Sequence, residues 1–172
     1  YTLQRPAAVN ITTSLATTPI GELLYDELRE VRVGDSDHYE RLPTLRSVLE
    51  LIKAEKDRPT THLYAELKSD GDFAGSAFAA GMPEATAREV RSVGVSPKHL
   101  SFISCSAGAL NATRKLLPDY NYYLVAHAET PVEAMDSARL AADSGFAGID
   151  LNADALNIHD AFVRFVHAQK MR

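Results

Sequence analysis

Apolar and polar residues follow two alternating patterns from about residue 44 to the end of the chain. A helix is predicted over 44–53, after Pro43-Thr44, because its apolar side chains recur every three or four positions: Leu45, Val48, Leu49 and Ile52. Short runs rich in apolar, β-branched and aromatic residues predict strands at 62–68, 99–104, 122–126 and 147–151. Strand and helix therefore alternate four times, which is the pattern of a parallel α/β sheet.

The helices that follow these strands are delimited by recognisable residues. We expect one from about Pro83 to Val93, and the apolar positions of the next are Leu110, Thr113 and Leu117. The third begins at a capping box, Thr130–Glu133, with Pro131 in the first helical position, and should stop near Gly145. Asn157 is the expected cap of the last helix, whose apolar face holds Ile158, Phe162, Phe165 and Val166.

Residues 1–43 lie outside this pattern. They hold a Thr/Ser-rich segment, a short helical stretch at 22–30 and a loop at Gly34–Asp37. We expect them to form a small insertion, similar to a lid, and residues 44–172 to form the βα units.

Composition excludes several classes of protein. The 172 residues are 45% hydrophobic and 24% charged, which fits one globular domain. The net charge of −5 argues against a general nucleic-acid binder, and no apolar run is long enough to cross a membrane. A single cysteine, Cys105, allows neither an internal disulfide nor a thiolate metal cage. We therefore expect a cytoplasmic protein with a small-molecule substrate; the oligomeric state stays open.

Two polar residues end the first strand, and the carboxyl ends of parallel strands are where such proteins place active sites. Glu66 and Lys68 are two positions apart, so both side chains point to the same side. A carboxylate beside an ammonium suits a divalent cation, Mg²⁺ or Ca²⁺, bound with an anionic ligand such as phosphate. A plain ion pair fits the same spacing equally well. Asp150 and Asn152 end the fourth strand in this way too, but Asx residues are common in loops that lead into helices.

The remaining reactive side chains have weaker patterns. His127 follows the third strand and fits either a general base or an incidental loop residue. His62 and His99 precede their strands, on the face that serves stability in such folds. Ser104-Cys105-Ser106 lacks the G-x-S-x-G pattern of a nucleophile elbow. The other histidines are expected at the surface or in loops: His38, His159 and His167.

Five segments in register resemble the glycerophosphodiester phosphodiesterase family, a group of TIM barrels. Thr2–Arg5 resembles its T-L-x-R, and Arg41–Leu45 resembles its I-P-T-L helix start. Tyr64–Lys68 matches its E-[IL]-K strand, Ser101-Phe102 matches its S-F at the next strand's end, and Arg114–Pro118 resembles the following R-x-L-x-P. Each motif is short, and their shared order makes the resemblance moderately specific.

The resemblance implies a metal-dependent phosphodiesterase that hydrolyses glycerophosphodiesters to glycerol 3-phosphate and an alcohol. It places Glu66 on the family's third metal carboxylate and Lys68 on the lysine that contacts the substrate phosphate. It assigns no catalytic residue within the chain, because the family's H-R-G and H-D histidines are expected ahead of Tyr1. The fold that it implies is a (β/α)8 barrel, of which this chain holds strands three to six, with residues 1–43 as the insertion between strands two and three.

Other interpretations remain open. One is a non-catalytic half-barrel or degenerate barrel that serves as a binding or assembly unit. Another is a different TIM-barrel enzyme, such as an isomerase or aldolase, although a Schiff-base lysine prefers an apolar pocket to a neighbouring carboxylate. Four isolated βα units would leave unpaired strand edges at 62–68 and 147–151, and we expect low stability and no phosphodiesterase activity from them alone.

Overall fold

The computed structural model describes residues 23–34, 39–54, 61–68, 77–152 and 158–172. The chain divides into two compact units, Tyr1–Val48 and Leu49–Arg172, which are described separately. The predicted boundary at residue 43 stays a prediction. No helix in the described ranges is long and apolar enough to span a membrane.

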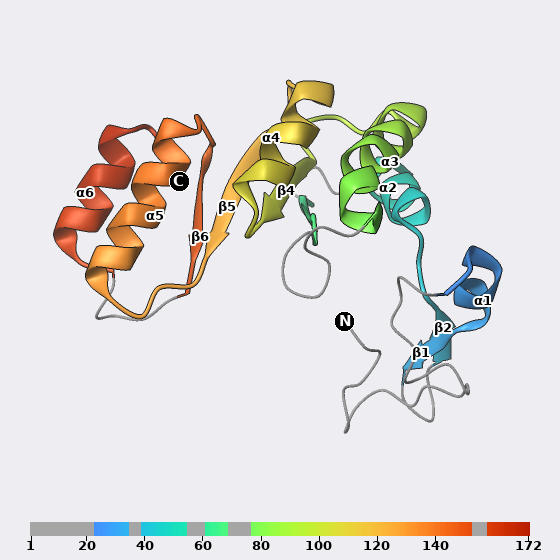
Figure 1. The fold of residues 1–172 in the computed structure, drawn as a ribbon. Coiled ribbons are helices and arrows are strands. Elements are labelled where there is room, and N and C mark those ends of the chain that lie inside the picture. Colours follow the sequence, from blue (N-terminus) through green and yellow to red (C-terminus); the bar gives the residue numbers. More distant parts are fainter. Residues whose placement is uncertain (1–22, 35–38, 55–60, 69–76, 153–157) are drawn as a thin grey trace. The chain divides into compact units, whose positions relative to one another are not determined.

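The second unit is built on a four-stranded parallel sheet with the strand order β3-β4-β5-β6 (Figure 1). The strands are β3 (Leu63–Glu66), β4 (Leu100–Ser104), β5 (Asn121–Ala126) and β6 (Gly148–Leu151). All four lie where the apolar runs predicted them. The order follows the sequence, as expected when each strand is joined to the next by a helix that crosses one face of the sheet.

The helices are α2 (Leu45–Ala54), α3 (Ala77–Val93), α4 (Ala107–Leu116), α5 (Pro131–Asp143) and α6 (Asp160–Ala168). Their ends confirm most of the local signals. Thr44 Oγ1 accepts a hydrogen bond from the Ser47 amide at 3.1 Å, and the Thr130–Glu133 capping box is formed. Gly145 follows α5 with a positive φ of 67° and closes it with a backbone bond to Ala142, as a C-terminal glycine cap does.

Two helix starts were predicted wrongly. α3 begins at Ala77, six residues before Pro83, so the proline lies inside the helix. The first turns have no apolar periodicity and contain a glycine and a proline, which hid them from the pattern. α6 is capped by His159, whose Nδ1 accepts from the Phe162 amide at 3.3 Å, and the predicted cap Asn157 lies outside the described residues. Ile158 precedes this helix and is exposed.

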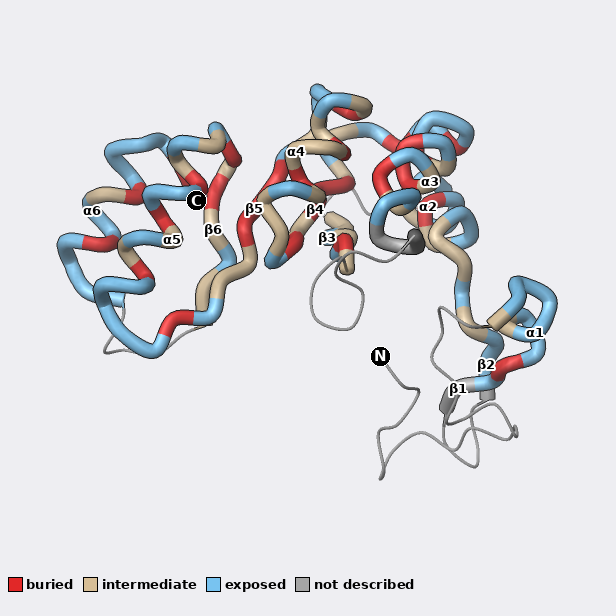
Figure 2. The backbone as a smooth tube through the Cα atoms, viewed as in Figure 1, coloured by how far each residue is buried: buried red, intermediate tan, exposed pale blue. Residues whose placement is uncertain are grey.

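The core lies between the sheet and its helices. Phe102 is paired in register with Tyr122, the two rings stack with centres 5.4 Å apart, and both side chains are buried. α4 packs on β4 and β5, and α5 packs on β5 and β6. Figure 2, which colours each residue by its burial, shows buried residues along β4 and β5, the two inner strands. Burial of each such large side chain stabilises the fold by about 1.5–3 kcal/mol.

The outer edge of β6 is partly paired, contrary to the prediction of a bare edge at 147–151. The Arg172 amide donates to the Ala147 carbonyl at 3.0 Å, and the Ile149 amide donates to the Arg172 carbonyl at 3.0 Å. These two bonds are the pattern of a parallel ladder, with Arg172 opposite Gly148. A Cβ on Gly148 would lie 2.1 Å from the Arg172 carbonyl oxygen, so only glycine allows this approach. Within the described residues β3 is an outer strand, as predicted.

The first unit contains a short helix and a hairpin. α1 (Tyr25–Glu30) matches the predicted helical stretch. β1 (Arg32–Gly34) and β2 (Tyr39–Arg41) pair antiparallel, a hairpin that we did not predict, because three-residue strands leave too short an alternation to recognise. The rest of the predicted loop, Asp35–Asp37, lies outside the described residues.

Candidate functional site at the carboxyl end of the sheet

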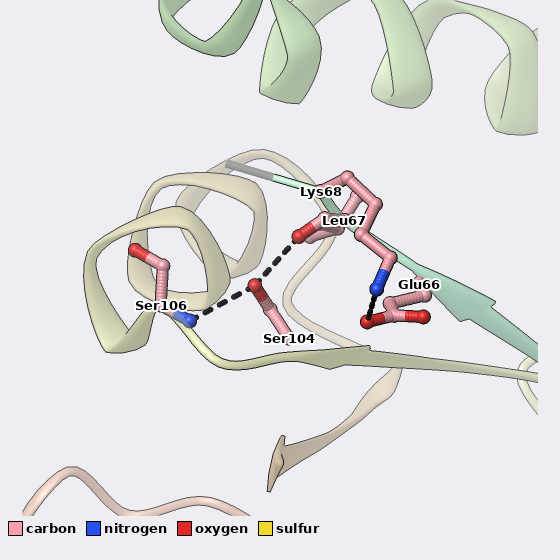
Figure 3. Close-up of polar contacts among 5 residues, drawn as sticks. All are labelled: Glu66, Leu67, Lys68, Ser104 and Ser106. Carbon is pink, nitrogen blue, oxygen red and sulfur yellow. Dashed lines mark hydrogen bonds and ion pairs between the residues drawn. The ribbon is translucent and has the colours of Figure 1, made fainter. Parts of the chain in front are cut away.

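Glu66 and Lys68 meet at the carboxyl end of β3. Glu66 is the last residue of the strand, and the Lys68 Nζ lies 2.5 Å from its Oε1 (Figure 3). About a third of each side chain is exposed, 32% for Glu66 and 33% for Lys68. The alternation of side chains along an extended backbone therefore brings the two predicted site residues together. A partly exposed ion pair of this kind contributes only about 0–1 kcal/mol to stability.

The backbone beneath this pair is held by β4. The Leu67 amide donates to the Ile103 carbonyl at 2.8 Å, and the Leu67 carbonyl accepts from Ser104 Oγ at 2.6 Å. The same hydroxyl accepts from the Ser106 amide at 3.1 Å (Figure 3). Ser104 is fully buried. A hydroxyl enclosed and bonded in this way is not an exposed nucleophile, which agrees with the missing G-x-S-x-G pattern.

Glu66 fits one position in the coordination sphere of a hard divalent cation. Its carboxylate has two oxygens, and the contact with Lys68 is made through Oε1. Ca²⁺ takes about six to eight oxygen ligands and Mg²⁺ about six. No group of three or more metal-ligating side chains occurs in the described part of the chain. Glu66 would therefore be one member of a larger ligand set.

Asp150 lies on the opposite outer strand of the sheet from Glu66. The register pairs Glu66 with Ile103, Ile103 with Tyr123, and Val125 with Asp150, so both carboxylates belong to the sheet face opposite the helices. Three strand spacings of about 4.8 Å separate the two strands along the sheet.

Asn152 has a structural role. Its Oδ1 accepts from the Ala128 amide at 2.9 Å, and its Nδ2 donates to the Ala128 carbonyl at 3.2 Å. The side chain thus ties the loop after β5 to the end of β6, in line with the prediction of an Asx loop residue. His127, beside this tie, is exposed. In the described part of the chain, no contact of His127 favours a role as general base over that of an incidental loop residue.

The two histidines at the amino end of the sheet join β3 to β4. His62 Nδ1 lies 2.9 Å from the Lys98 carbonyl oxygen and Nε2 lies 2.8 Å from Ser101 Oγ. A carbonyl only accepts, so Nδ1 donates to the Lys98 carbonyl. His99 Nδ1 contacts the Thr61 carbonyl at 3.0 Å. Both histidines directly precede their strands, as predicted, and their contribution to stability stays a prediction.

Ser101-Phe102 occupies a different place from the one that its motif match implied. The pair forms the second and third residues of β4, and the strand ends at Ser104. Ser101 is fully buried next to His62, and Phe102 is in the core. The match to a strand-end S-F is therefore wrong in position.

Arg114, from the R-x-L-x-P match, closes the end of α5. Its Nη1 donates to the carbonyls of Ser144 at 2.7 Å and Gly145 at 3.0 Å, and its Nη2 donates to Asn111 Oδ1 at 2.8 Å. The guanidinium lies 5.2 Å from the centre of the Phe146 ring. A cation at a helix C-terminus interacts favourably with the helix dipole. The motif thus has a structural function at the amino end of the sheet.

The other candidates have no place in the site. Cys105 is exposed, and Ser106 caps α4 by accepting from the Ala109 amide at 3.2 Å. His167 is exposed in the last turn of α6, and His38 lies outside the described residues. A cavity of about 410 Å³ lies on the sheet face opposite the helices, and its lining is mainly apolar and aromatic: Tyr64, Ile103, Tyr123, Ile149, Asp150 and Arg172.

The sequence matches no protein-family model and no curated protein. Solved structures do match. Two proteins assigned as glycerophosphodiester phosphodiesterases, from Galdieria sulphuraria and Silicibacter pomeroyi, give TM-scores of 0.69 and 0.70 at 20% identity, over 91% of this chain and 57% of theirs. A glycerophosphodiester phosphodiesterase from Parabacteroides distasonis gives a TM-score of 0.63 at 23% identity, over 95% of this chain and 66% of its own.

These matches define the class of fold. The second unit is part of a TIM-barrel-like α/β fold, and the predicted fold class is confirmed. The resemblance drawn from the motifs is confirmed at the same level, since all three proteins carry that family's name. The chain spans between 57% and 66% of the length of these proteins.

Proposed function

We propose that this chain is part of a metal-dependent phosphodiesterase that hydrolyses glycerophosphodiesters to glycerol 3-phosphate and an alcohol. The observation that carries the proposal is the contact of 2.5 Å between Lys68 and Glu66 at the carboxyl end of β3. It is supported by the position of this pair on a parallel sheet, because TIM-barrel enzymes place their active sites at the carboxyl ends of the strands. The names of the three similar structures support the choice of substrate class.

The two residues would have separate roles. Glu66 would supply one oxygen ligand to Mg²⁺ or Ca²⁺, and Lys68 would donate a hydrogen bond to a non-bridging phosphate oxygen. The bound cation would add positive charge where negative charge develops on the phosphate. In the reaction, water or the substrate's own hydroxyl would attack phosphorus and lose a proton. The bond from phosphorus to the alcohol oxygen would break, and that oxygen would gain a proton. The neighbouring Glu66 carboxylate would keep the Lys68 ammonium at the carboxyl end of β3 when no phosphate is bound.

The substitution Glu66→Gln tests the proposal. It removes a charged oxygen ligand and keeps the size of the side chain, so metal-dependent turnover should fall by about 10²–10³-fold, the loss typical of one group that stabilises developing charge. The measurement, on the intact enzyme of which this chain is part, is the release of glycerol 3-phosphate from glycerophosphocholine at graded Mg²⁺ and Ca²⁺ concentrations. Full activity in Glu66→Gln would refute the assignment.

A matched control separates this effect from a general change of charge. Asp136 lies on α5 in an exposed ion pair with Arg139, with a contact of 2.9 Å. Asp136→Asn also removes one exposed carboxylate, and it should leave turnover within about twofold, because exposed ion pairs contribute little. Equal losses in the two variants would argue against a specific role for Glu66.

A further inference from the structure

The peptide groups between Glu66 and Lys68 are fixed by β4. The Leu67 amide bonds to the Ile103 carbonyl at 2.8 Å, which continues the strand ladder one residue past the end of β3. The Leu67 carbonyl accepts from the Ser104 hydroxyl at 2.6 Å. That carbonyl belongs to the peptide unit that leads directly into Lys68. Its orientation therefore sets the direction in which Lys68 leaves the strand.

Ser104 is itself held firmly. Its side chain is fully buried, and its hydroxyl both donates to Leu67 and accepts from the Ser106 amide at 3.1 Å. Ser106 in turn caps α4 through the Ala109 amide at 3.2 Å. The contact that orients Lys68 is thus connected to the first turn of a helix, a rigid support of the kind that functional residues require.

We propose that Ser104 is a positioning residue for the Glu66–Lys68 pair. Its hydroxyl adds one hydrogen bond to the backbone ladder between β3 and β4, at the point where β4 ends and α4 is about to begin. This hydrogen bond keeps the Lys68 ammonium beside the Glu66 carboxylate. Figure 3 shows the arrangement, with the hydroxyl between Leu67 and Ser106. This inference rests on the proposed function of the pair. Ser104 does not touch the reacting atoms.

The test compares Ser104→Ala with Ser106→Ala. Both variants remove one serine hydroxyl at the junction of β4 and α4, but only the first removes a bond to Leu67. Ser104→Ala should lower kcat/KM for glycerophosphocholine by about 10–100-fold, as loss of a ligand-orienting contact does, and should raise the Mg²⁺ concentration that gives half-maximal activity. Ser106→Ala should leave both quantities within about twofold.

A second measurement does not depend on activity. Amide hydrogen exchange followed by NMR should show faster exchange at Leu67, whose amide bonds to Ile103, in Ser104→Ala, and faster exchange at Ala109 in Ser106→Ala. If Ser104→Ala does not fold, Ser104→Cys provides the same comparison, because a thiol is a weaker hydrogen-bond donor of similar size. Its loss of kcat/KM should be smaller but should again exceed that of Ser106→Ala.

The possible failures are distinguishable. An active wild type of the intact enzyme in which both serine variants lose activity equally, with unchanged exchange at Leu67, would overturn the positioning role and leave the proposed function in place. If the intact enzyme that contains this chain has no activity on any glycerophosphodiester, at any Mg²⁺ or Ca²⁺ concentration, the proposed function is overturned and the positioning role with it.

Discussion

The two ends of the four-stranded sheet carry similar polar side chains and use them in opposite ways. At the amino end, His62 contacts both the Lys98 carbonyl and the Ser101 hydroxyl, and Ser101 is fully buried. At the carboxyl end, Glu66 and Lys68 pair with each other and keep about a third of each side chain exposed. A serine–histidine contact would suggest catalysis by its chemistry alone. Its burial at the amino end of the strands makes it a structural link instead.

The bonds to main-chain groups show the same division. At the amino end, Arg114 binds the carbonyls of Ser144 and Gly145, and His99 binds that of Thr61. Arg114 thus joins α4 to the end of α5, and His99 joins the start of β4 to the residues ahead of β3. At the carboxyl end, the Ser104 hydroxyl also binds a carbonyl, but that carbonyl precedes a charged and accessible residue. A hydrogen bond to a carbonyl therefore stabilises the fold at the amino end. At the carboxyl end, in our proposal, it fixes the position of Lys68 beside Glu66.

The largest expected effect comes from a change at the carboxyl end. Lys68→Met removes the ammonium and keeps much of the aliphatic chain. It should lower kcat/KM for a glycerophosphodiester by about 10²–10³-fold, the loss typical of one donor to a developing negative charge. The free energy of unfolding should change by less than about 1 kcal/mol, because the ion pair is partly exposed. Steady-state kinetics measure kcat/KM, and urea unfolding measures the free energy of unfolding. A large loss of stability with normal kcat/KM would show that the carboxyl end serves stability instead of activity.

A change at the amino end should have the opposite signature. His62→Ala removes both hydrogen bonds of the ring and leaves the buried Ser101 hydroxyl without this partner. Unfolding should become easier by about 1–3 kcal/mol, while kcat/KM of the folded protein stays unchanged. The exposed His127 is the matched control, and His127→Ala should stay within about 0.5 kcal/mol. A selective loss of kcat/KM in His62→Ala would show that the amino end takes part in the reaction.

A smaller effect should appear at high pH. Burial raises the pKa of Tyr122 well above its usual 10.0, and Arg114 opposes the rise. Tyr122 therefore ionises first in the unfolded chain, so its contribution to stability is constant below about pH 10 and decreases as the pH rises above it. Tyr122→Phe should cost about 1 kcal/mol at neutral pH, since the bond of 2.8 Å to the Leu117 carbonyl is lost.

The same variant should lose stability less steeply above pH 10 than the wild type does. Urea unfolding between pH 8 and pH 11 measures both slopes. Part of the slope should remain, because the pKa of Tyr120 is also raised by burial and by Asp119. Identical slopes in the two proteins would contradict the role of Tyr122.

The sequence alone determined the order of strands and helices in the second unit and the end of the sheet, the carboxyl end, that holds the candidate site. Apolar periodicity located all four strands, and the capping box at Thr130–Glu133 and the glycine at 145 located the ends of α5. Such signals can be recognised in the sequence because they depend on residues that are only a few positions apart. The pairing of Glu66 with Lys68 was predictable for the same reason, since only two positions separate them. The start of α3 was missed where the local signal was weak.

Only the tertiary structure decided what the remaining polar groups do. The bond from Ser104 to Leu67 joins residues 37 positions apart, and the contact of His62 with Ser101 spans 39 positions. The bonds that bring Arg172 against β6 also depend on the return of the chain after α6. Partners at such distances in the chain are set by strand register and by the path of each crossover helix, and neither leaves a local pattern in the sequence. Because most buried polar groups in folded proteins form hydrogen bonds, the packed sheet pairs one buried serine with a histidine and another with the backbone beneath the candidate site.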